Sequence, residues 1–170
     1  MKPLIAVCGS DGDDSNLSEY AIQIAEDVGR YIARSQGILI CGGRGGIMEA
    51  ACKGAKDESG VTVGILPDTK EEANEFVDIP IVTGLGHRRN FLVVNSADAV
   101  IAISGRWGTL NEISFAMIFD KPVILIKGTG GISDRIITDI FRDILSSRCF
   151  IVNSAEEAVN KAIRIQWMEW

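Results

Sequence analysis

The chain has 170 residues, a length that predicts a single domain over residues 1–170. Hydrophobic residues make up 46% of it and charged residues 24%, which is a globular composition and excludes a disordered or collagen-like chain. Lysine and arginine number 17 against 23 aspartates and glutamates, and the net charge of -6 argues against nucleic acid or an anionic membrane as the main partner.

Taken in chain order, short apolar runs alternate with segments of helical periodicity. In the first such segment apolar residues recur every three or four positions from Leu17 to Ile32, and Ser15 or Asn16 is the expected N-cap. The predicted elements are strand 4–8, helix 17–32, strand 37–41, helix 47–56, strands 61–66 and 76–82, helix 88–96, strand 98–103, helix 109–119, strand 122–126, helix 132–146, strand 150–152 and helix 155–165.

The alternation of strands and helices predicts parallel pairing, because a parallel connection needs a crossover of about a dozen residues. The apolar runs are continuous, which is typical of strands that are covered on both faces. We therefore expect an α/β fold of three layers, α/β/α, with a doubly wound and mostly parallel sheet.

The apolar runs and the cysteines allow predictions about the cellular compartment of the protein and about bound cofactors. We expect neither a membrane span nor a signal peptide, since Asp98, Asp120 and Lys121 interrupt the most apolar region and the run 4–8 is short. We therefore expect a cytoplasmic protein. The four cysteines form no CxxC motif and have no histidine at metal-ligand spacing, so we interpret them as buried reduced thiols and predict no metal or other cofactor.

Two glycine-rich loops follow predicted strands and lead directly into predicted helices. They are Cys41-Gly42-Gly43-Arg44-Gly45-Gly46 and Ser104-Gly105-Arg106-Trp107-Gly108-Thr109. Ligands of open parallel sheets bind beyond the carboxyl ends of the strands, where glycines let the N–H groups of a helix start approach an anion. The loops predict a nucleotide or another phosphorylated small molecule as partner, and the alternative is that they are only tight turns.

Known phosphate and metal motifs fit poorly. Neither loop has the lysine of a P-loop, and Met48 stands where the dinucleotide fingerprint needs its third glycine. The run Asp11-Gly12-Asp13-Asp14 has two interpretations, a magnesium site or acids favoured by the dipole of a helix start. We predict no metal site.

A cationic cluster, Gly86-His87-Arg88-Arg89-Asn90, stands out in this acidic chain. The planar donor fork of arginine matches phosphate or carboxylate groups. The alternative is a solvated surface patch, since charge runs usually lie at the surface.

These segments occur together in the order seen in the LOG (LONELY GUY) family, also described as lysine decarboxylases, although nothing in this sequence supports a decarboxylase. The resemblance is carried by the Gly42–Gly46 loop with Ile47-Met48, His87-x-Arg89, Ser-Ala-Asp-Ala at 96–99 and Gly105-x-x-Gly108-Thr109-x-x-Glu112. It extends from Cys8-Gly9-Ser10 to about residue 146. The chain also resembles the related molybdenum-cofactor carrier proteins.

The resemblance implies a Rossmann-like nucleotide-binding fold, a homodimer, and hydrolysis of a nucleoside 5′-monophosphate to free base and ribose 5-phosphate. In that family an arginine and the glutamate of the signature PGGxGTxxE are needed for catalysis, and the resemblance implies these roles for Arg89 and Glu112. The predicted phosphate- and nucleotide-binding residues are Gly9, Ser10, Gly42, Gly43, Gly45, Gly46, Met48, Gly105, Arg106, Gly108 and Thr109. Apolar helices after residue 85 and the aromatic tail 167–170 independently favour a homodimer.

The sequence departs from the pattern of the family at three positions. Ser104 replaces the proline of the signature, Arg106 replaces its second glycine, and Asn90 stands where cytokinin-activating members have lysine. A second hypothesis is therefore a nucleotide- or molybdenum-cofactor-binding carrier without turnover.

Glu112 has two interpretations. Departure of a base from C1′ builds oxocarbenium character on the ribose, which a nearby carboxylate stabilises while it orients or deprotonates water. Alternatively, Thr109-x-x-Glu112 is a capping box at a helix start.

Overall fold

The structure is a computed structural model that describes residues 1–138 and 147–167. Within these ranges seven strands form one sheet in the order β4-β3-β2-β1-β5-β6-β7, and every neighbouring pair is parallel. The order reverses between β1 and β5, which is the kind of switch point at which open α/β sheets bind ligands. The strands are β1 (Leu4–Gly9), β2 (Ile38–Cys41), β3 (Val61–Leu66), β4 (Ile79–Val82), β5 (Ala99–Ile103), β6 (Val123–Ile126) and β7 (Cys149–Val152).

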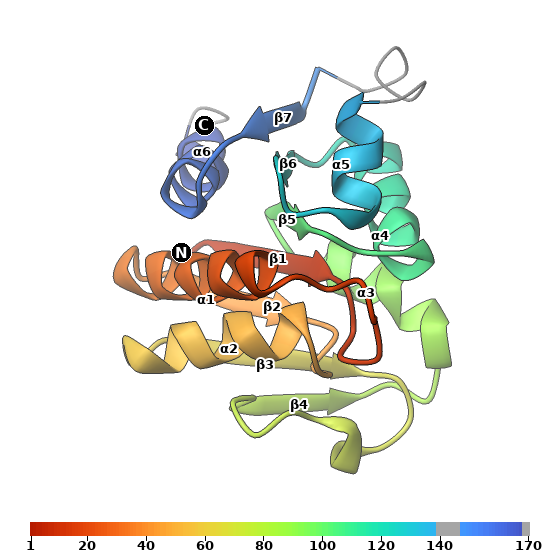
Figure 1. The fold of residues 1–170 in the computed structure, drawn as a ribbon. Coiled ribbons are helices and arrows are strands. Elements are labelled where there is room, and N and C mark those ends of the chain that lie inside the picture. The colour runs from red at the N-terminus through yellow and green to blue at the C-terminus, as the bar shows by residue number, and fades with distance from the viewer. Residues whose placement is uncertain (139–146, 168–170) are drawn as a thin grey trace.

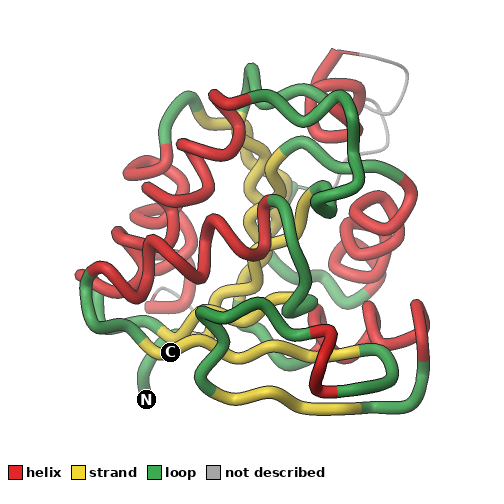
Figure 2. The backbone as a smooth tube through the Cα atoms, turned by 60° about the horizontal axis from the view of Figure 1, so that its bottom comes forward, coloured by secondary structure: helices red, strands yellow, loops and turns green. Residues whose placement is uncertain are grey.

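Helices cover both faces of the sheet, as the two views in Figure 1 and Figure 2 show. One face packs against α1 (Glu19–Arg34), α2 (Ile47–Asp57) and α6 (Ala155–Trp167). The other packs against α3 (Asn90–Asn95), α4 (Trp107–Ile118) and α5 (Gly131–Thr138). Two short 3-10 helices, η1 (Lys70–Glu72) and η2 (Gly86–Arg89), lie before and after β4. The expected three-layer, doubly wound α/β fold is confirmed.

The continuous apolar runs have a direct explanation in the core. All five residues of β5 are buried. Ala99, Ile101 and Ile103 pack on the side of α1, α2 and α6, whereas Val100 and Ala102 pack on the opposite side. Successive side chains of a strand point to opposite faces, so a strand covered on both sides is apolar at every position.

The start of α1 and the start of β4 differ from the prediction for clear physical reasons. The N-cap of α1 is Ser18, whose Oγ accepts a hydrogen bond of 3.1 Å from the N–H of Ala21, and not Ser15 or Asn16. Strand 76–82 is shorter than expected, because Thr62 donates its hydroxyl to the carbonyl of Phe76 and accepts from the N–H of Asp78. These side-chain bonds replace the strand ladder before Ile79.

Two helices also differ in their bounds. The predicted helix 88–96 begins as the 3-10 turn η2 and continues as α3, which ends at Asn95. The predicted helix 132–146 is described as α5 from Gly131 to Thr138, and the remainder of that prediction lies outside the described residues.

α1 and α2 pack backbone against backbone through two glycines. A Cβ added at Gly29 would lie 1.9 Å from the carbonyl oxygen of Ala51, and one at Gly54 would lie 1.9 Å from that of Glu26. Only glycine permits this close approach. The pair is flanked by ion pairs, including Lys53 to Glu26 at 2.8 Å.

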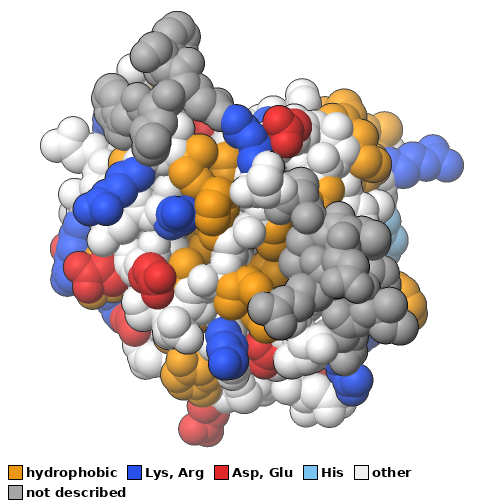
Figure 3. Space-filling model, turned by 90° about the horizontal axis from the view of Figure 1, so that it is seen from above, with side chains coloured by type: hydrophobic (Ala, Val, Ile, Leu, Met, Phe, Trp, Pro, Cys, Tyr) orange, Lys and Arg blue, Asp and Glu red, His pale blue; other side chains and the backbone are white. Residues whose placement is uncertain are grey.

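Both outer strands of the sheet expose apolar side chains. On β4, Ile79 is 47% exposed and Ile81 45%. Figure 3 looks onto the β7 end of the sheet, where apolar side chains reach the surface, and Ile151 on β7 is 40% exposed. None of the helices in the described part of the chain has the length and apolar composition needed to span a membrane.

Candidate functional site

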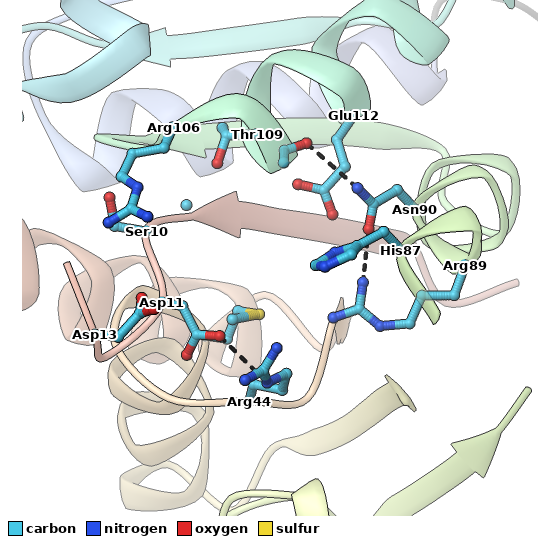
Figure 4. Close-up of a pocket in the computed structure, with 13 residues that line it drawn as sticks. Ser10, Asp11, Asp13, Arg44, His87, Arg89, Asn90, Arg106, Thr109 and Glu112 are labelled. Atoms are coloured by element: carbon cyan, nitrogen blue, oxygen red, sulfur yellow. Dashed lines mark hydrogen bonds and ion pairs between the residues drawn. The ribbon is translucent and has the colours of Figure 1, made fainter. Parts of the chain in front are cut away.

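A cavity of about 360 Å³ lies at the carboxyl ends of β1 and β5, at the switch point of the sheet (Figure 4). Predicted site residues that line it are Gly9, Ser10, Met48, Arg89, Arg106, Gly108, Thr109 and Glu112. Further lining residues, which were not in the predicted set, are Asp11, Asp13, Arg44, His87 and Asn90. Gly42, Gly43, Gly45, Gly46 and Gly105 do not line the cavity.

The start of α4 opens onto this cavity. Its N-cap is Arg106, which makes no side-chain cap, and the N–H of Leu110 donates to the carbonyl of Arg106. The preceding N–H groups of the first turn have no acceptor within the helix, and they carry the positive end of its dipole. Gly108 and Thr109 line the cavity here, and the Thr109 hydroxyl is directed toward its centre in Figure 4. This helix start has the features of an anion site.

The first glycine loop packs differently from the second. The N–H of Ile47, the first residue of α2, donates to the carbonyl of Ser10 at 2.9 Å. A Cβ at Gly46 would lie 2.4 Å from the same oxygen, so the segment after β1 covers the start of α2. The four glycines of this loop do not line the cavity, and Arg44 of the loop and Met48 of α2 line it instead.

The loop after β5 is held in a tight turn that a proline could not adopt. Ser104 is buried with φ of +54°, and its N–H donates to Thr129 Oγ1 at 2.9 Å. Its carbonyl accepts from the hydroxyl of Ser133 at 2.7 Å. Proline fixes φ near −65° and has no N–H, so the departure from the family signature at this position is a structural one.

Ser10 connects the β1 and β5 loops. Its hydroxyl donates to Asp14 at 2.6 Å and accepts from the N–H of Gly105 at 3.0 Å. The bond from Ser10 is the main cause that lowers the pKa of Asp14, and Arg106 lies 3.7 Å from the same carboxylate. Within the described ranges, no group of three or more His, Cys, Asp or Glu side chains is arranged to hold a metal ion.

Arg89 is buried, although the two residues before it, His87 and Arg88, are exposed. Its Nη1 donates to Asn90 Oδ1 at 2.6 Å and its Nη2 to the carbonyl of Gly42 at 3.3 Å, while its buried Nε has no hydrogen-bond partner. The surface-patch interpretation is therefore wrong for Arg89, whereas His87 and Arg88 lie at the surface and His87 also lines the cavity. A buried guanidinium with an unused donor at a cavity wall is suited to bind an anionic or polar ligand.

Asn90 ties this arginine to α4. Its Nδ2 donates to the carbonyl of Gly108 at 3.4 Å and to Asn111 Oδ1 at 3.1 Å, while its Oδ1 accepts from Arg89. The residue that replaces the lysine of cytokinin-activating relatives thus fixes the position of a cavity-lining cation. The spacing of the cationic cluster contained no signal for this link.

Glu112 lies in the second turn of α4 and is only 7% exposed. Burial raises its pKa from 4.5 to about 7, although the charge of Arg89 and a hydrogen bond with Cys8 act in the opposite direction. The capping-box interpretation is wrong, because the helix starts at Trp107 and Thr109 lies inside it. Glu112 thus has a pKa suited to proton transfer near neutral pH.

The raised pKa of Glu112 predicts a pH dependence of stability. Between pH 4.5 and about 7 the carboxyl of Glu112 binds more protons in the folded state than in the unfolded state. The contribution of Glu112 to the free energy of unfolding is therefore present at low pH and is lost as the pH rises through 7. Relative to Glu112→Gln, we expect the wild type to lose about 2 kcal/mol of unfolding free energy between about pH 5 and pH 8. Urea unfolding of both proteins at the two pH values measures it, and parallel pH profiles would contradict it.

Comparisons with known proteins agree with the fold and the motifs. The model of the SLOG cluster4 family matches residues 2–159. A protein of Archaeoglobus fulgidus is 46% identical over 109 residues, which are 64% of this chain and 72% of that protein. The cytokinin riboside 5′-monophosphate phosphoribohydrolase of Rhodococcoides fascians is 34% identical over 117 residues, which cover 62% of this chain and 59% of that enzyme. A solved structure, the molybdenum cofactor binding protein of Rippkaea orientalis, matches with a TM-score of 0.87 and 35% identity over 98% of both chains.

Proposed function

Since this chain belongs to the SLOG cluster4 family and is similar to a LOG-type enzyme, we propose that it hydrolyses the N-glycosidic bond of nucleoside 5′-monophosphates. The products are the free base and ribose 5-phosphate. The observation that carries the proposal is the position of Glu112, a buried carboxyl in the wall of a cavity whose other groups include a helix start and the buried Arg89.

The proposed reaction assigns a separate task to each of these groups. The start of α4, with Gly108 and Thr109, binds the 5′-phosphate. The bond between C1′ and the base nitrogen breaks, its electron pair leaves with the base, and ionised Glu112 stabilises the cationic ribose. Water adds to C1′ and gives its proton to Glu112, while the departing base takes up one proton from solvent and leaves neutral. Glu112 then returns its proton to solvent, so that one proton is lost by water and one is gained by the base. Arg89 holds the ligand against Glu112.

The test is the release of free base from a panel of purine and pyrimidine nucleoside 5′-monophosphates, separated by chromatography. We expect base and ribose 5-phosphate in equal amounts from at least one of them. Binding of nucleotides without release of any base would contradict the hydrolase and support the alternative below.

The alternative function is a carrier that binds a nucleotide or the molybdenum cofactor without turnover. It is favoured by the match to a molybdenum cofactor binding protein and by the loop at Ser104, whose φ of +54° differs from anything the proline of the signature can adopt. Arg106, which is the N-cap of α4, adds a cation to the phosphate site where the signature has glycine.

Replacement of Arg89 separates binding from turnover. Arg89→Ala removes a buried donor group from the cavity wall, and we expect it to weaken nucleotide binding by about 10- to 100-fold. Calorimetry with adenosine 5′-monophosphate measures the loss. Arg164→Ala is the matched control, because its side chain is exposed and does not line this cavity. Equal affinities for Arg89→Ala and Arg164→Ala would show that Arg89 does not hold the ligand.

We further propose that the chain forms a homodimer through the exposed face of β4. Ile79 and Ile81 lie two residues apart on one side of this edge strand, and Leu85 is exposed just after it. Of the aromatic tail 167–170, which also favoured a dimer, residues 168–170 lie outside the described residues.

Light scattering at micromolar concentration is expected to give about twice the chain mass of 18.4 kDa. Ile81→Lys should return the mass to that of one chain, because a dimer would bury an unpaired charge. Ile118→Lys, at an equally apolar and more exposed position of α4, should not. A wild-type mass of one chain would refute the dimer.

We also propose a cytoplasmic location. Cys8, Cys41, Cys52 and Cys149 are all free, and the sulfurs of Cys41 and Cys52 lie 3.6 Å apart without a covalent bond. Free thiols at this distance are typical of a reducing compartment.

A further inference from the structure

α4 presents groups of different chemistry in sequence along its length. Gly108 and Thr109 stand at its start, Glu112 follows one turn later, and Phe115 comes after another turn. With a rise of ~1.5 Å per residue, Thr109, Glu112 and Phe115 succeed one another at steps of about 4.5 Å along the axis. Residues three apart are neighbours on a helix surface. The order of an anion site, a carboxyl and an aromatic ring matches the order of phosphate, ribose and base in a nucleotide.

An aromatic hollow of about 530 Å³ lies beyond Glu112, lined by His87, Arg88, Phe91, Asn111 and Phe115. It lies next to the site cavity, since His87 lines both. The rings of Phe91 and Phe115 meet edge to face with centroids 5.8 Å apart, and Phe91 is 39% exposed. An exposed aromatic surface next to a polar cavity is suited to contact a planar heterocycle.

The labelled side chains in Figure 4 show that the two ends of the cavity differ in their lining. Arg106 and Ser10 lie at one end near the start of α4, whereas Glu112, Asn90 and His87 lie at the other. Asn111 lines the aromatic hollow together with His87, and its Oδ1 already accepts from Asn90. The amide N–H₂ group of Asn111 is therefore left to donate to an acceptor on the edge of a base.

We propose that the aromatic hollow is the subsite for the base, so that the nucleotide lies along α4 with its phosphate at Thr109, C1′ at Glu112 and the base against Phe115. The inference rests on the proposed function, because it takes the α4 start as the phosphate site. It defines the ligand class as a nucleotide whose base is a planar heterocycle with a hydrogen-bond acceptor at its edge. Ribose 5-phosphate, which lacks the base, would fill the cavity and leave the hollow empty.

Calorimetry with adenosine 5′-monophosphate and ribose 5-phosphate tests this orientation. Both ligands are titrated into Glu112→Gln protein, which prevents hydrolysis during the measurement. We expect the nucleotide to bind at least about tenfold tighter than ribose 5-phosphate, since the contact of a base with an aromatic side chain supplies that difference. Adding Phe115→Ala should lower the affinity for the nucleotide about tenfold and leave that for ribose 5-phosphate unchanged. Adding Ile118→Ala, an exposed apolar residue of α4 outside the hollow, should change neither affinity.

The possible results separate the subsite from the proposed reaction. Equal affinities for the two ligands, or an equal loss of both on Phe115→Ala, would overturn the base subsite, and base release by the wild type would still support hydrolysis. The expected affinities without base release by the wild type would support the subsite and refute hydrolysis. A Phe115→Ala variant that changes the mass in light scattering, with unchanged nucleotide affinity, would show that a second copy covers the hollow and overturn the subsite. Binding of neither ligand would overturn both proposals.

Discussion

Replacement of Glu112 by glutamine is expected to lower the turnover of nucleoside monophosphates by about 10²- to 10⁴-fold and to leave their binding nearly unchanged. Glutamine has almost the same shape, so the packing of this buried position is kept. It cannot accept a proton from water, and it carries no charge to stabilise the cationic ribose. Steady-state rates of base release, together with calorimetric affinities, measure the two effects separately.

Glu71→Gln is the matched control, since this exposed carboxylate in η1 does not line the cavity. Its rate should equal that of the wild type. If the wild type turns over and Glu112→Gln keeps more than about a tenth of the rate, the catalytic assignment of Glu112 is wrong.

The second large effect is expected on stability, at the contact between α1 and α2. Gly29→Ala would place a methyl group 1.9 Å from the carbonyl oxygen of Ala51, so the two helices must separate. The higher helix propensity of alanine recovers less than about 1 kcal/mol. We expect Gly29→Ala to lower the free energy of unfolding by about 3 kcal/mol, at the upper end of overpacking costs, and Gly54→Ala to behave alike. Urea denaturation monitored by circular dichroism measures the loss.

Gly108→Ala provides the comparison within a helix. A Cβ at Gly108 meets only Asn90 Nδ2, at 4.0 Å, so this substitution should be neutral or slightly stabilising. Unfolding free energies that agree within about 0.5 kcal/mol for all three variants would mean that α1 and α2 do not pack as closely as described.

The layered fold could be predicted because its signal recurs along the whole chain, whereas element ends depend on single contacts. Asn16 donates its N–H to the carboxylate of Asp14, and Leu17 donates to the carbonyl of Asp14. These bonds close a turn before the helix, so α1 cannot begin until Ser18. Composition alone does not distinguish Ser15, Asn16 and Ser18 as caps.

Part of the candidate site could be predicted because its residues follow a local sequence pattern. Thr109 and Glu112 follow a strand end in a recognisable pattern, and the structure places both in the cavity wall. The first glycine loop has an equally strong local pattern, but the Ser10–Gly12 segment lies over its helix start. That is a tertiary contact with no local signal. Likewise, which cation of the run from His87 to Arg89 is buried depends on the direction of the η2 turn.

The left-handed turn at Ser104 has a consequence for how this branch of the family can evolve. A single change from serine to proline is blocked twice, by φ of +54° and by the N–H that Thr129 accepts. The family signature and this loop are therefore separated by a step that needs simultaneous changes at Ser104 and at its partners Thr129 and Ser133. Related chains that have serine at the position of Ser104 should also have threonine and serine at the positions of Thr129 and Ser133. Replacement of the loop after β5 by the complete signature loop should preserve the fold only when the loop before α5 is replaced with it.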